Sequence, residues 1–196
     1  NTIDDIIILV GPGNNGSDGL AIGRQLCNRG HCVRALLLSP AEEMNEEAKY
    51  QLDLAFDYGV KVTEIKKADQ LASFLEQTSR HCLILDAIMG VGFRPPLSNQ
   101  LFDMVNVING HDHLVVAVDL PTGVGPDTGS VSGNAIHADA SLVVACPKSG
   151  HFIGDGAIHS GSLLLLNAGL PLKSLEGGDK FLLDKDSVSY FYKKRS

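Results

Sequence analysis

The 196-residue sequence contains no tryptophan, and aromatic residues make up only 6% of it. It lacks any apolar stretch near the roughly 18 residues that a membrane-spanning helix requires, so we expect no integral membrane segment. It also lacks any long run of lysines and arginines, and its formal net charge is −7. A nucleic-acid backbone or a membrane surface is therefore not expected as a partner, whereas a small polar ligand is.

Metal-binding and secretory signals are missing as well. Cys27, Cys32, Cys82 and Cys146 form no CxxC pair and show no zinc-type spacing with histidine. We interpret them as reduced, structural thiols. The first residues show no basic segment followed by an apolar one, so the residues given contain no secretory signal. These observations favour a cytoplasmic protein.

The common catalytic motifs are absent. There is no GxSxG, no HExxH, and no cysteine in the setting of an obvious nucleophile, which leaves little support for covalent catalysis. His137 and His151 lie near a glycine-rich loop, but no spacing assigns either of them a function.

What the sequence does contain is an alternation of strand-like and helix-like segments. Apolar runs of strand length occur at 6–10, 33–38, 82–85, 114–118, 141–145 and 162–166. Helix-like segments lie between them at about 18–29, 41–58, 68–78 and 98–108. The first four runs are continuously hydrophobic, which is typical of strands buried on both faces. The pattern predicts one α/β domain with a mostly parallel sheet and helices on both faces, and Gly30 and Gly59 as left-handed residues after helices.

Three loops should leave the carboxyl ends of strands, where open parallel sheets bind ligands. They are "GPGNNGSDG" (11–19), "LDAIMGVGFRPP" (85–96) and "VDLPTGVGPDTG" (118–129). The first offers glycines for close approach to an anion and opens a helix whose N-terminus favours negative charge. It is neither a dinucleotide fingerprint nor a P-loop. A plain turn capped by Ser17 or Asp18 stays an alternative, although it leaves Asn14 and Asn15 unexplained.

Two aspartates end buried strands and should point toward the same edge of the sheet as the first loop. Asp86 and Asp119 could equally cap the turns that follow them. Together with an asparagine oxygen and a threonine hydroxyl, a carboxylate is a hard ligand for a group 1 or group 2 cation, so Asn15, Asp86 and Thr122 are a candidate set. Arg94 could pair with a phosphate or simply lie in solvent.

Taken together, the loops resemble the YjeF N-terminal domain family, the NAD(P)HX epimerases. "GPGNNGSDG", "DAIMGVGF" and "VAVDLPTGVGPDTG" are similar to three signatures of that family, and "ADASLVVACPKSGH" and "LLLLNAGLP" to two later ones. The likeness runs in the family's order from about residue 6 to 171. It departs from the pattern at Ser17, where the family has glycine, at Thr122, where it has serine, at "FRPP" and at Asn167.

The resemblance implies a Rossmann-like three-layer α/β/α sandwich, usually a homodimer, that interconverts the R and S forms of hydrated NADH and NADPH at C6 of the nicotinamide ring. It implies a potassium ion held by Asn15, Asp86 and Thr122. The implied substrate-binding residues are Asn14, Asn15, Gly16, Ser17, Asp18, Gly90, Val91, Gly92, Phe93, Arg94, Pro95, Pro96 and Asp119. As catalytic acid/base we propose Asp119, with Lys148 of the "PKSG" turn as the alternative.

The resemblance also bears on domain organisation. We expect the epimerase domain at 1–171 and a connecting segment at 172–196 leading toward an ADP/ATP-dependent dehydratase domain, as in bifunctional repair enzymes, so that the native polypeptide would be longer at both ends. The family's customary helix before the first strand is missing from the residues given. Two other functions stay open: a non-catalytic binding module of the same fold, and a nucleotide-dependent oxidoreductase.

Overall fold

The computed structural model describes residues 3–167, 169–171 and 173. The first half of the chain forms β1 (Asp5–Val10), α1 (Asn14–Asn28), β2 (Val33–Leu37), the 3₁₀ turn η1 (Ala41–Glu43), α2 (Glu46–Asp57), β3 (Lys61–Glu64) and α3 (Ala68–Glu76). The second half forms β4 (Cys82–Ala87), α4 (Asn99–Asn109), β5 (Leu114–Val118), β6 (Ala140–Val144), η2 (Ser149–His151), α5 (Gly156–His159) and β7 (Ser162–Leu166).

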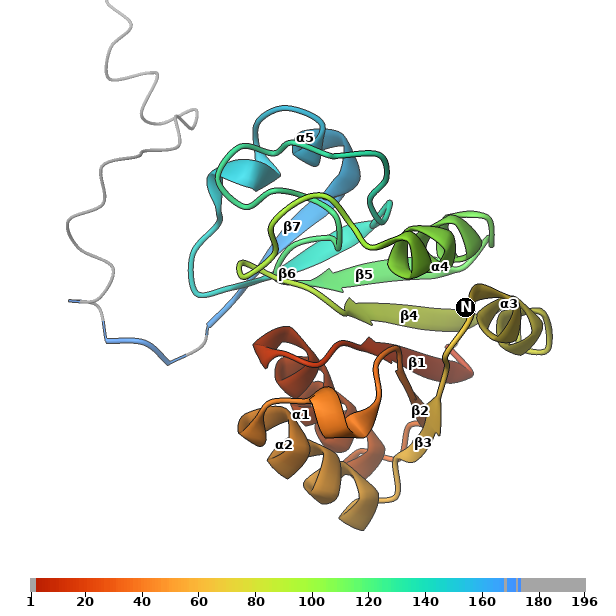
Figure 1. The fold of residues 1–196 in the computed structure, drawn as a ribbon. Coiled ribbons are helices and arrows are strands. Elements are labelled where there is room, and N and C mark those ends of the chain that lie inside the picture. Colours follow the sequence, from red (N-terminus) through yellow and green to blue (C-terminus); the bar gives the residue numbers. More distant parts are fainter. Residues whose placement is uncertain (1–2, 168, 172, 174–196) are drawn as a thin grey trace, which may run out of the picture.

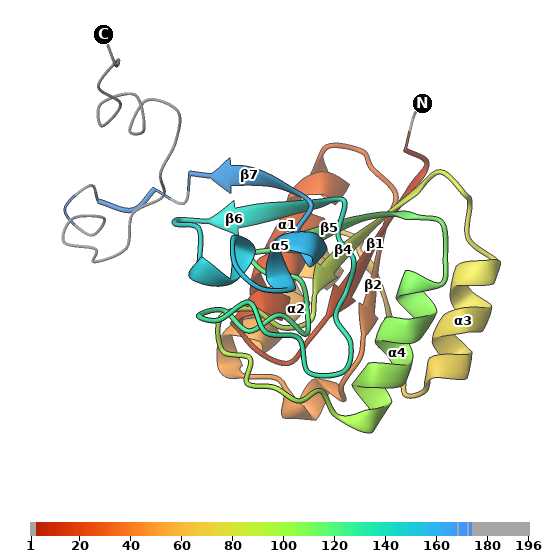
Figure 2. The same cartoon turned by 90° about the horizontal axis from the view of Figure 1, so that it is seen from above.

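The strands form one seven-stranded sheet in the order β3-β2-β1-β4-β5-β6-β7, and every neighbouring pair is parallel. Helices α1 and α2 pack together on one face, and α3 and α4 lie side by side on the other (Figures 1 and 2). The predicted Rossmann-like three-layer α/β/α architecture is confirmed.

The strand β1 explains why the apolar runs are continuous. Ile7 and Leu9 belong to the core cluster under α3 and α4, whereas Ile6, Ile8 and Val10 belong to the cluster under α1 and α2. Successive side chains of a strand point to opposite faces, and here a helical layer covers both. Burial on two sides therefore requires an apolar residue at every position from Ile6 to Val10.

Several local predictions need correction. The strand β3 was not predicted, because its residues Lys61–Glu64 are largely exposed at the sheet edge and carry no apolar run. The expected helix at 41–58 is divided into η1 and α2, since the Asn45 side chain accepts a hydrogen bond from the Ala48 N–H at 2.8 Å and starts a new helix. The predicted left-handed Gly30 and Gly59 are confirmed, with φ of +89° and +85°.

The remaining predictions on the chain as a whole have mixed outcomes. The predicted connecting segment 172–196 lies, apart from Lys173, outside the described residues. All four cysteines are free thiols, as expected, with Cys82 buried and Cys32 and Cys146 exposed. None of the helices in the described part of the chain is long and apolar enough to cross a bilayer.

Candidate functional site

A cavity of about 530 Å³ opens at the carboxyl ends of β1 and β4, the neighbouring strands from which the chain continues in opposite directions along the sheet. The loops after two such strands diverge, which leaves a crevice between them. One wall of the cavity comes from the turn after β1 and the start of α1, and the other from residues 88–98 after β4. Asp119, which follows β5, also lines it.

The glycines of the first loop are needed for contact with the protein's own backbone. A Cβ atom on Gly11 would lie 1.9 Å from the carbonyl oxygen of Ile88, and one on Gly16 would lie 2.0 Å from the carbonyl oxygen of Gly11. The close approach of Gly11 to Ile88 brings the first and second loops together, and that of Gly16 to Gly11 lies within the first loop. Around Gly13, by contrast, a Cβ atom would meet nothing within 4 Å, and Gly13 lines the cavity. There is therefore space for the predicted close approach of an anion to the backbone at Gly13. At Gly11 and Gly16 the protein's own backbone fills that space.

The helix α1 begins earlier than predicted. Its N-cap is Gly13, and no side chain caps it, so the alternative of a turn capped by Ser17 or Asp18 is wrong. Residues 14–18 instead form the first turns of α1 beside the cavity. The free N–H groups and the helix dipole at this end favour a negatively charged ligand.

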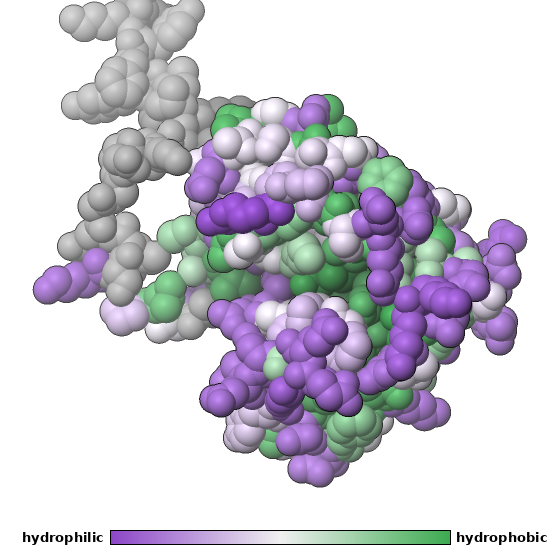
Figure 3. Space-filling model, in the orientation of Figure 1, coloured by the Kyte–Doolittle hydropathy of each residue, from purple (hydrophilic) through white to green (hydrophobic). Residues whose placement is uncertain are grey.

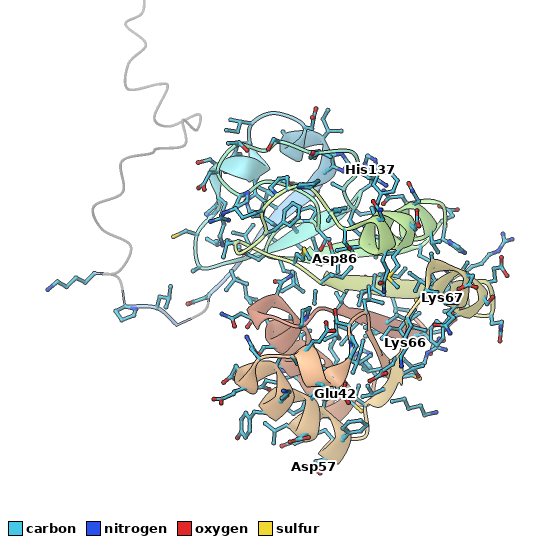
Figure 4. The ribbon with its side chains drawn as sticks, in the orientation of Figure 1. Glu42, Asp57, Lys66, Lys67, Asp86 and His137 are labelled. Atoms are coloured by element: carbon cyan, nitrogen blue, oxygen red, sulfur yellow. The ribbon has the colours of Figure 1, made fainter. Side chains whose placement is uncertain are left out.

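Asp86 joins the end of β4 to the third loop. One of its carboxylate oxygens accepts hydrogen bonds from the Thr122 hydroxyl at 2.7 Å and the Ile88 N–H at 3.2 Å, and the other accepts from the Thr122 N–H at 2.7 Å. The Thr122 hydroxyl in turn accepts a hydrogen bond from the Met89 N–H at 3.0 Å. Asp86 and Thr122 have no exposed surface, and Asp86 lies in the middle of the molecule (Figure 4).

Burial raises the pKa of Asp86 to about 6, although its hydrogen bonds with Thr122 and Ile88 oppose the rise. Among the described residues, no lysine, arginine or histidine forms an ion pair with Asp86. Three hydrogen bonds also leave a carboxylate with further capacity to accept. A cation can stabilise the charged form of a buried carboxylate that has no ion-pair partner and can accept further contacts.

Asp86 and Thr122 offer oxygen atoms of the kind that hold a group 1 or group 2 cation, and Asn15 is the third residue of the predicted set. Asn15 is a buried side chain whose amide nitrogen has no hydrogen-bond partner among the described residues, and its amide oxygen would lie 3.1 Å from a Cβ atom built on Gly90. Carboxylate, amide and hydroxyl oxygens are ligands of that class of ion. The described residues contain no cluster of three or more His, Cys, Asp or Glu side chains that could hold a metal ion.

Asp119 has a left-handed backbone, with φ of +68°, which is uncommon for a residue with a side chain. Its N–H donates to the Leu142 carbonyl at 2.9 Å, and its carboxylate accepts a hydrogen bond from the Val144 N–H at 3.3 Å. The residue is 6% exposed, and that small exposed part faces the cavity. Contacts with β6 therefore fix a strained aspartate at the cavity wall.

Lys148 and His151 complete this arrangement. The Lys148 ammonium forms an ion pair with the Asp119 carboxylate and also donates to the Val144 carbonyl at 2.9 Å. The His151 ring lies between the two backbones: its Nδ1 accepts from the Lys148 N–H at 2.9 Å, and its Nε2 donates to the Asp119 carbonyl at 2.8 Å. Because a backbone N–H can only donate, Nδ1 accepts in the contact with Lys148, and Nε2 carries the hydrogen that faces the Asp119 carbonyl.

Two further charged side chains line the cavity. Asp18 lies on the first turns of α1, where desolvation first, and then the nearby charges of Asp119 and Glu47, raise the pKa of its carboxyl. Arg94 donates to the carbonyl oxygens of Phe93 at 2.8 Å and Val91 at 3.2 Å. The Arg94 guanidinium thus braces the second loop while its remaining N–H groups are available to a ligand.

Comparison with known proteins decides the family. The sequence model of the family described as "YjeF-related protein N-terminus" matches residues 1–150. The chain belongs to this family. It is 35% identical over 168 residues to the NAD(P)H-hydrate epimerase of Levilactobacillus brevis, an alignment that covers 86% of this chain and 74% of the relative. The epimerase of Rhodopirellula baltica is 32% identical over 171 residues, covering 87% of this chain and 68% of the relative.

Longer members of the YjeF family and one solved structure are also similar. The bifunctional NAD(P)H-hydrate repair enzyme Nnr of Salinibacter ruber is 31% identical over 174 residues, which are 85% of this chain and 32% of that protein. The chain thus spans about a third of the bifunctional relative. The crystal structure of yeast ynu0, YNL200c, superposes with a TM-score of 0.73 at 22% identity, covering 94% of this chain and 76% of the yeast chain, and so shows the same fold.

The structure of this YjeF-family chain brings many of the predicted site residues to one cavity. Those that line it are Asn14, Asn15, Asp18, Gly90, Val91, Gly92, Phe93, Arg94, Pro96 and Asp119. Six others do not line it: Gly16, Ser17, Pro95, Asp86, Thr122 and Lys148. Buried Gly16 and Ser17 belong to α1, and Lys148 reaches the site through Asp119.

His151 was not among the residues predicted for the site. It ends the segment "ADASLVVACPKSGH", but no spacing in the sequence indicates its contact with Asp119, which depends on η2 turning the ring back toward the end of β5. His137, considered beside it, lies on the outer surface instead (Figure 4) and stacks on the ring of His159 at 4.0 Å between centroids.

Proposed function

We propose that this protein is an NAD(P)H-hydrate epimerase, an isomerase that interconverts the R and S forms of NADHX and NADPHX in the repair of hydrated nicotinamide nucleotides. The observation that carries the proposal is the ion pair between the Asp119 carboxylate and the Lys148 ammonium at the wall of a cavity beside a helix N-terminus. The names of the relatives support the same activity.

The chemistry asked of this pair is a reversible loss of water. In the hydrate, a hydroxyl stands on the ring carbon C6, next to the ring nitrogen. When that hydroxyl takes a proton, the C6–O bond breaks, water leaves, and the nitrogen lone pair forms a planar iminium. Water then adds to the other face and returns a proton, so that atoms balance and no oxidation occurs. Asp119 and Lys148 hold a proton acceptor and a proton donor side by side, as this exchange requires.

The diphosphate and sugar of the substrate would bind along the rest of the cavity. The first turns of α1 supply N–H groups at Asn14 and Asn15, and Arg94 supplies a guanidinium on the opposite wall. Holding the ring carbon against Asp119 contributes through position as well as through proton transfer. The strained backbone of Asp119 fits this role, because such strain is concentrated at active sites.

Asn15, Asp86 and Thr122 would hold the potassium ion. When bound, the ion would supply positive charge next to the buried Asp86 carboxylate and close to the diphosphate. The residues themselves tie the second and third loops together through the Asp86–Thr122 hydrogen bonds.

The wider setting belongs to the same proposal. We place the epimerase domain at 1–171 and assign 172–196 to the connection toward an ADP/ATP-dependent dehydratase domain, the functional partner that consumes the S form. The bifunctional relatives support this. A cytoplasmic location is supported by four free thiols, which a reducing compartment preserves. A homodimer is supported by the exposed leucines 164–166 on the edge strand β7.

Proton NMR of an R/S mixture of NADHX tests the function. Wild-type protein should bring an S-enriched sample to the R/S equilibrium without forming an oxidised ring. Asp119→Asn should keep the fold, since asparagine tolerates the left-handed backbone, and should lose the interconversion. Asp112→Asn, an exposed aspartate before β5, is the matched control and should retain full activity.

The same spectra separate the two other functions. A ligand-induced line broadening with unchanged R/S ratio in the wild type would identify a binding module. Oxidation of the ring would identify an oxidoreductase. Full activity of Asp119→Asn would remove Asp119 from the mechanism.

A further inference from the structure

A second cavity, of about 440 Å³, adjoins the first along the carboxyl edge of the sheet. It extends beyond the ends of β2 and β3 to the first turns of α4. The residues that line both cavities are Pro12, Ile88, Met89 and Ser98. The two cavities therefore lie next to each other and share this border.

The lining of the second cavity combines apolar walls with a polar rim. Its walls include the side chains of Leu38, Ile65 and Met104, which belong to the core cluster under α3 and α4. Figure 3 shows apolar surface exposed on this side of the molecule between hydrophilic borders. Ser39 and Gln100 supply polar groups at the rim. A planar nucleobase, which has apolar faces and hydrogen-bonding edges, matches such a lining. The volume of the cavity is typical of small-molecule sites.

The charges of the rim are arranged around this space. The Lys66 ammonium lies 3.5 Å from the Glu64 carboxylate, and the other oxygen of Glu64 accepts a hydrogen bond from the Ala41 N–H at 3.4 Å. Gln100 donates to the Lys66 carbonyl at 3.0 Å, which joins α4 to the segment after β3. Lys66 is labelled in Figure 4 beside this segment. The rim is thus held in place without a ligand, although both acidic and basic groups remain accessible.

Two helices begin at the border between the cavities. The N-cap of the 15-residue helix α1 is Gly13, and the N-cap of the 11-residue helix α4 is Ser98, whose hydroxyl oxygen accepts a hydrogen bond from the Leu101 N–H. The positive ends of both helix dipoles therefore meet there, a favourable position for a diphosphate. Asp119 lines the first cavity and not the second, so the reacting ring must occupy the first.

We propose that the second cavity binds the adenosine half of the dinucleotide substrate, with the diphosphate crossing the border between the two cavities. This inference rests on the proposed function, which places the hydrated nicotinamide against Asp119. It assigns a substrate-binding role to residues outside the three loops, chiefly Ser39 after β2 and Gln100 on α4.

The test compares two substrates that differ only in the adenosine half: NADHX and the hydrate of reduced nicotinamide mononucleotide. Ser39→Trp places an indole in the second cavity, at a residue that does not line the first. The KM for NADHX should rise at least about tenfold, a loss of about 1.4 kcal/mol, while the KM for the mononucleotide hydrate stays unchanged. Ser73→Trp, on the exposed face of α3, is the matched control and should change neither KM.

A second variant and a second measurement guard against misfolding of Ser39→Trp. Gln100→Trp substitutes an exposed helix position on the other side of the same cavity and should give the same selective loss. Calorimetry with adenosine 5′-monophosphate should detect binding to the wild type and to Asp119→Asn. It should detect none to Ser39→Trp or Gln100→Trp, and each of these two variants counts only if its melting temperature equals that of the wild type.

The outcomes keep the two proposals apart. If the wild type epimerises both substrates and the tryptophan variants lose activity on both equally, or on neither, the adenosine assignment is wrong and the epimerase function stands. If the wild type epimerises neither substrate, the proposed function fails, and binding of adenosine 5′-monophosphate still decides the use of the second cavity.

Discussion

The Nε2 atom of His151 lies 2.8 Å from the backbone carbonyl oxygen of Asp119, a residue 32 positions earlier in the chain. The same ring accepts the N–H of Lys148 through Nδ1. One imidazole thus connects the backbones of the two residues that form the ion pair at the cavity wall. The left-handed conformation of Asp119 costs roughly 1–2 kcal/mol for a residue with a side chain. The hydrogen bonds of His151 help to hold Asp119 in that conformation.

We predict that His151 is a positioning residue. In His151→Ala, kcat should fall roughly 10- to 100-fold while KM changes less than about twofold, because the carboxylate loses its alignment with the reacting carbon and the cavity stays intact. His151→Gln should recover part of kcat, since its amide can donate at the position of Nε2.

Steady-state kinetics on NADHX measure this split. His81→Ala, an exposed histidine just before β4, is the control and should behave like the wild type. An equal loss of stability and activity in His151→Ala and His151→Gln, with KM rising in both, would point to a purely structural role.

We predict that the Thr122 hydroxyl is required for stability. Thr122→Val removes a donor to the buried Asp86 carboxylate and the acceptor of the Met89 N–H, so the free energy of unfolding should drop by about 3 kcal/mol. Thr122→Ser keeps both hydrogen bonds and loses one methyl group, so it should cost about 1 kcal/mol. Urea unfolding of the three proteins measures the difference, and equal losses in both variants would contradict it.

We predict a pH dependence of stability from Asp86. Its pKa is about 6 in the folded protein and 3.8 in the unfolded chain, so the unfolded chain releases this proton first as the pH rises. The stabilisation associated with protonated Asp86 is fully present below pH 3.8 and is lost by pH 6, a decrease of about 3 kcal/mol. Relative to Asp86→Asn, the wild type should lose this amount between pH 4 and pH 7.

Chemical unfolding at several pH values, in potassium chloride and in tetramethylammonium chloride, checks this prediction. If the site holds potassium, that salt alone should restore stability above pH 6, and only in the wild type. A constant difference between wild type and Asp86→Asn across the pH range would show that Asp86 does not titrate differently in the folded state.

Much of the fold could be predicted from local patterns. The continuous apolar run of β1 required cover on both faces, and the alternation with helical segments predicted a parallel sheet with helices on both faces. Exposed Lys61–Glu64 could not be recognised as a strand, because an edge strand in contact with solvent needs no apolar run. The start of α1 was misplaced because Gly13, as N-cap, offers no side-chain signal.

For the site, the sequence by itself determined which chemistry is available: two aspartates after buried strands, an asparagine pair at a helix start, and the motifs that carry the family resemblance. Only the tertiary structure decided how that chemistry is divided. Asp86 turns inward to Thr122, Asp119 faces the cavity, and His151 and Lys148 reach Asp119 from η2 and the residue before it. The physical reason is that strand order and register decide which distant side chains meet, and no single segment of the chain encodes them.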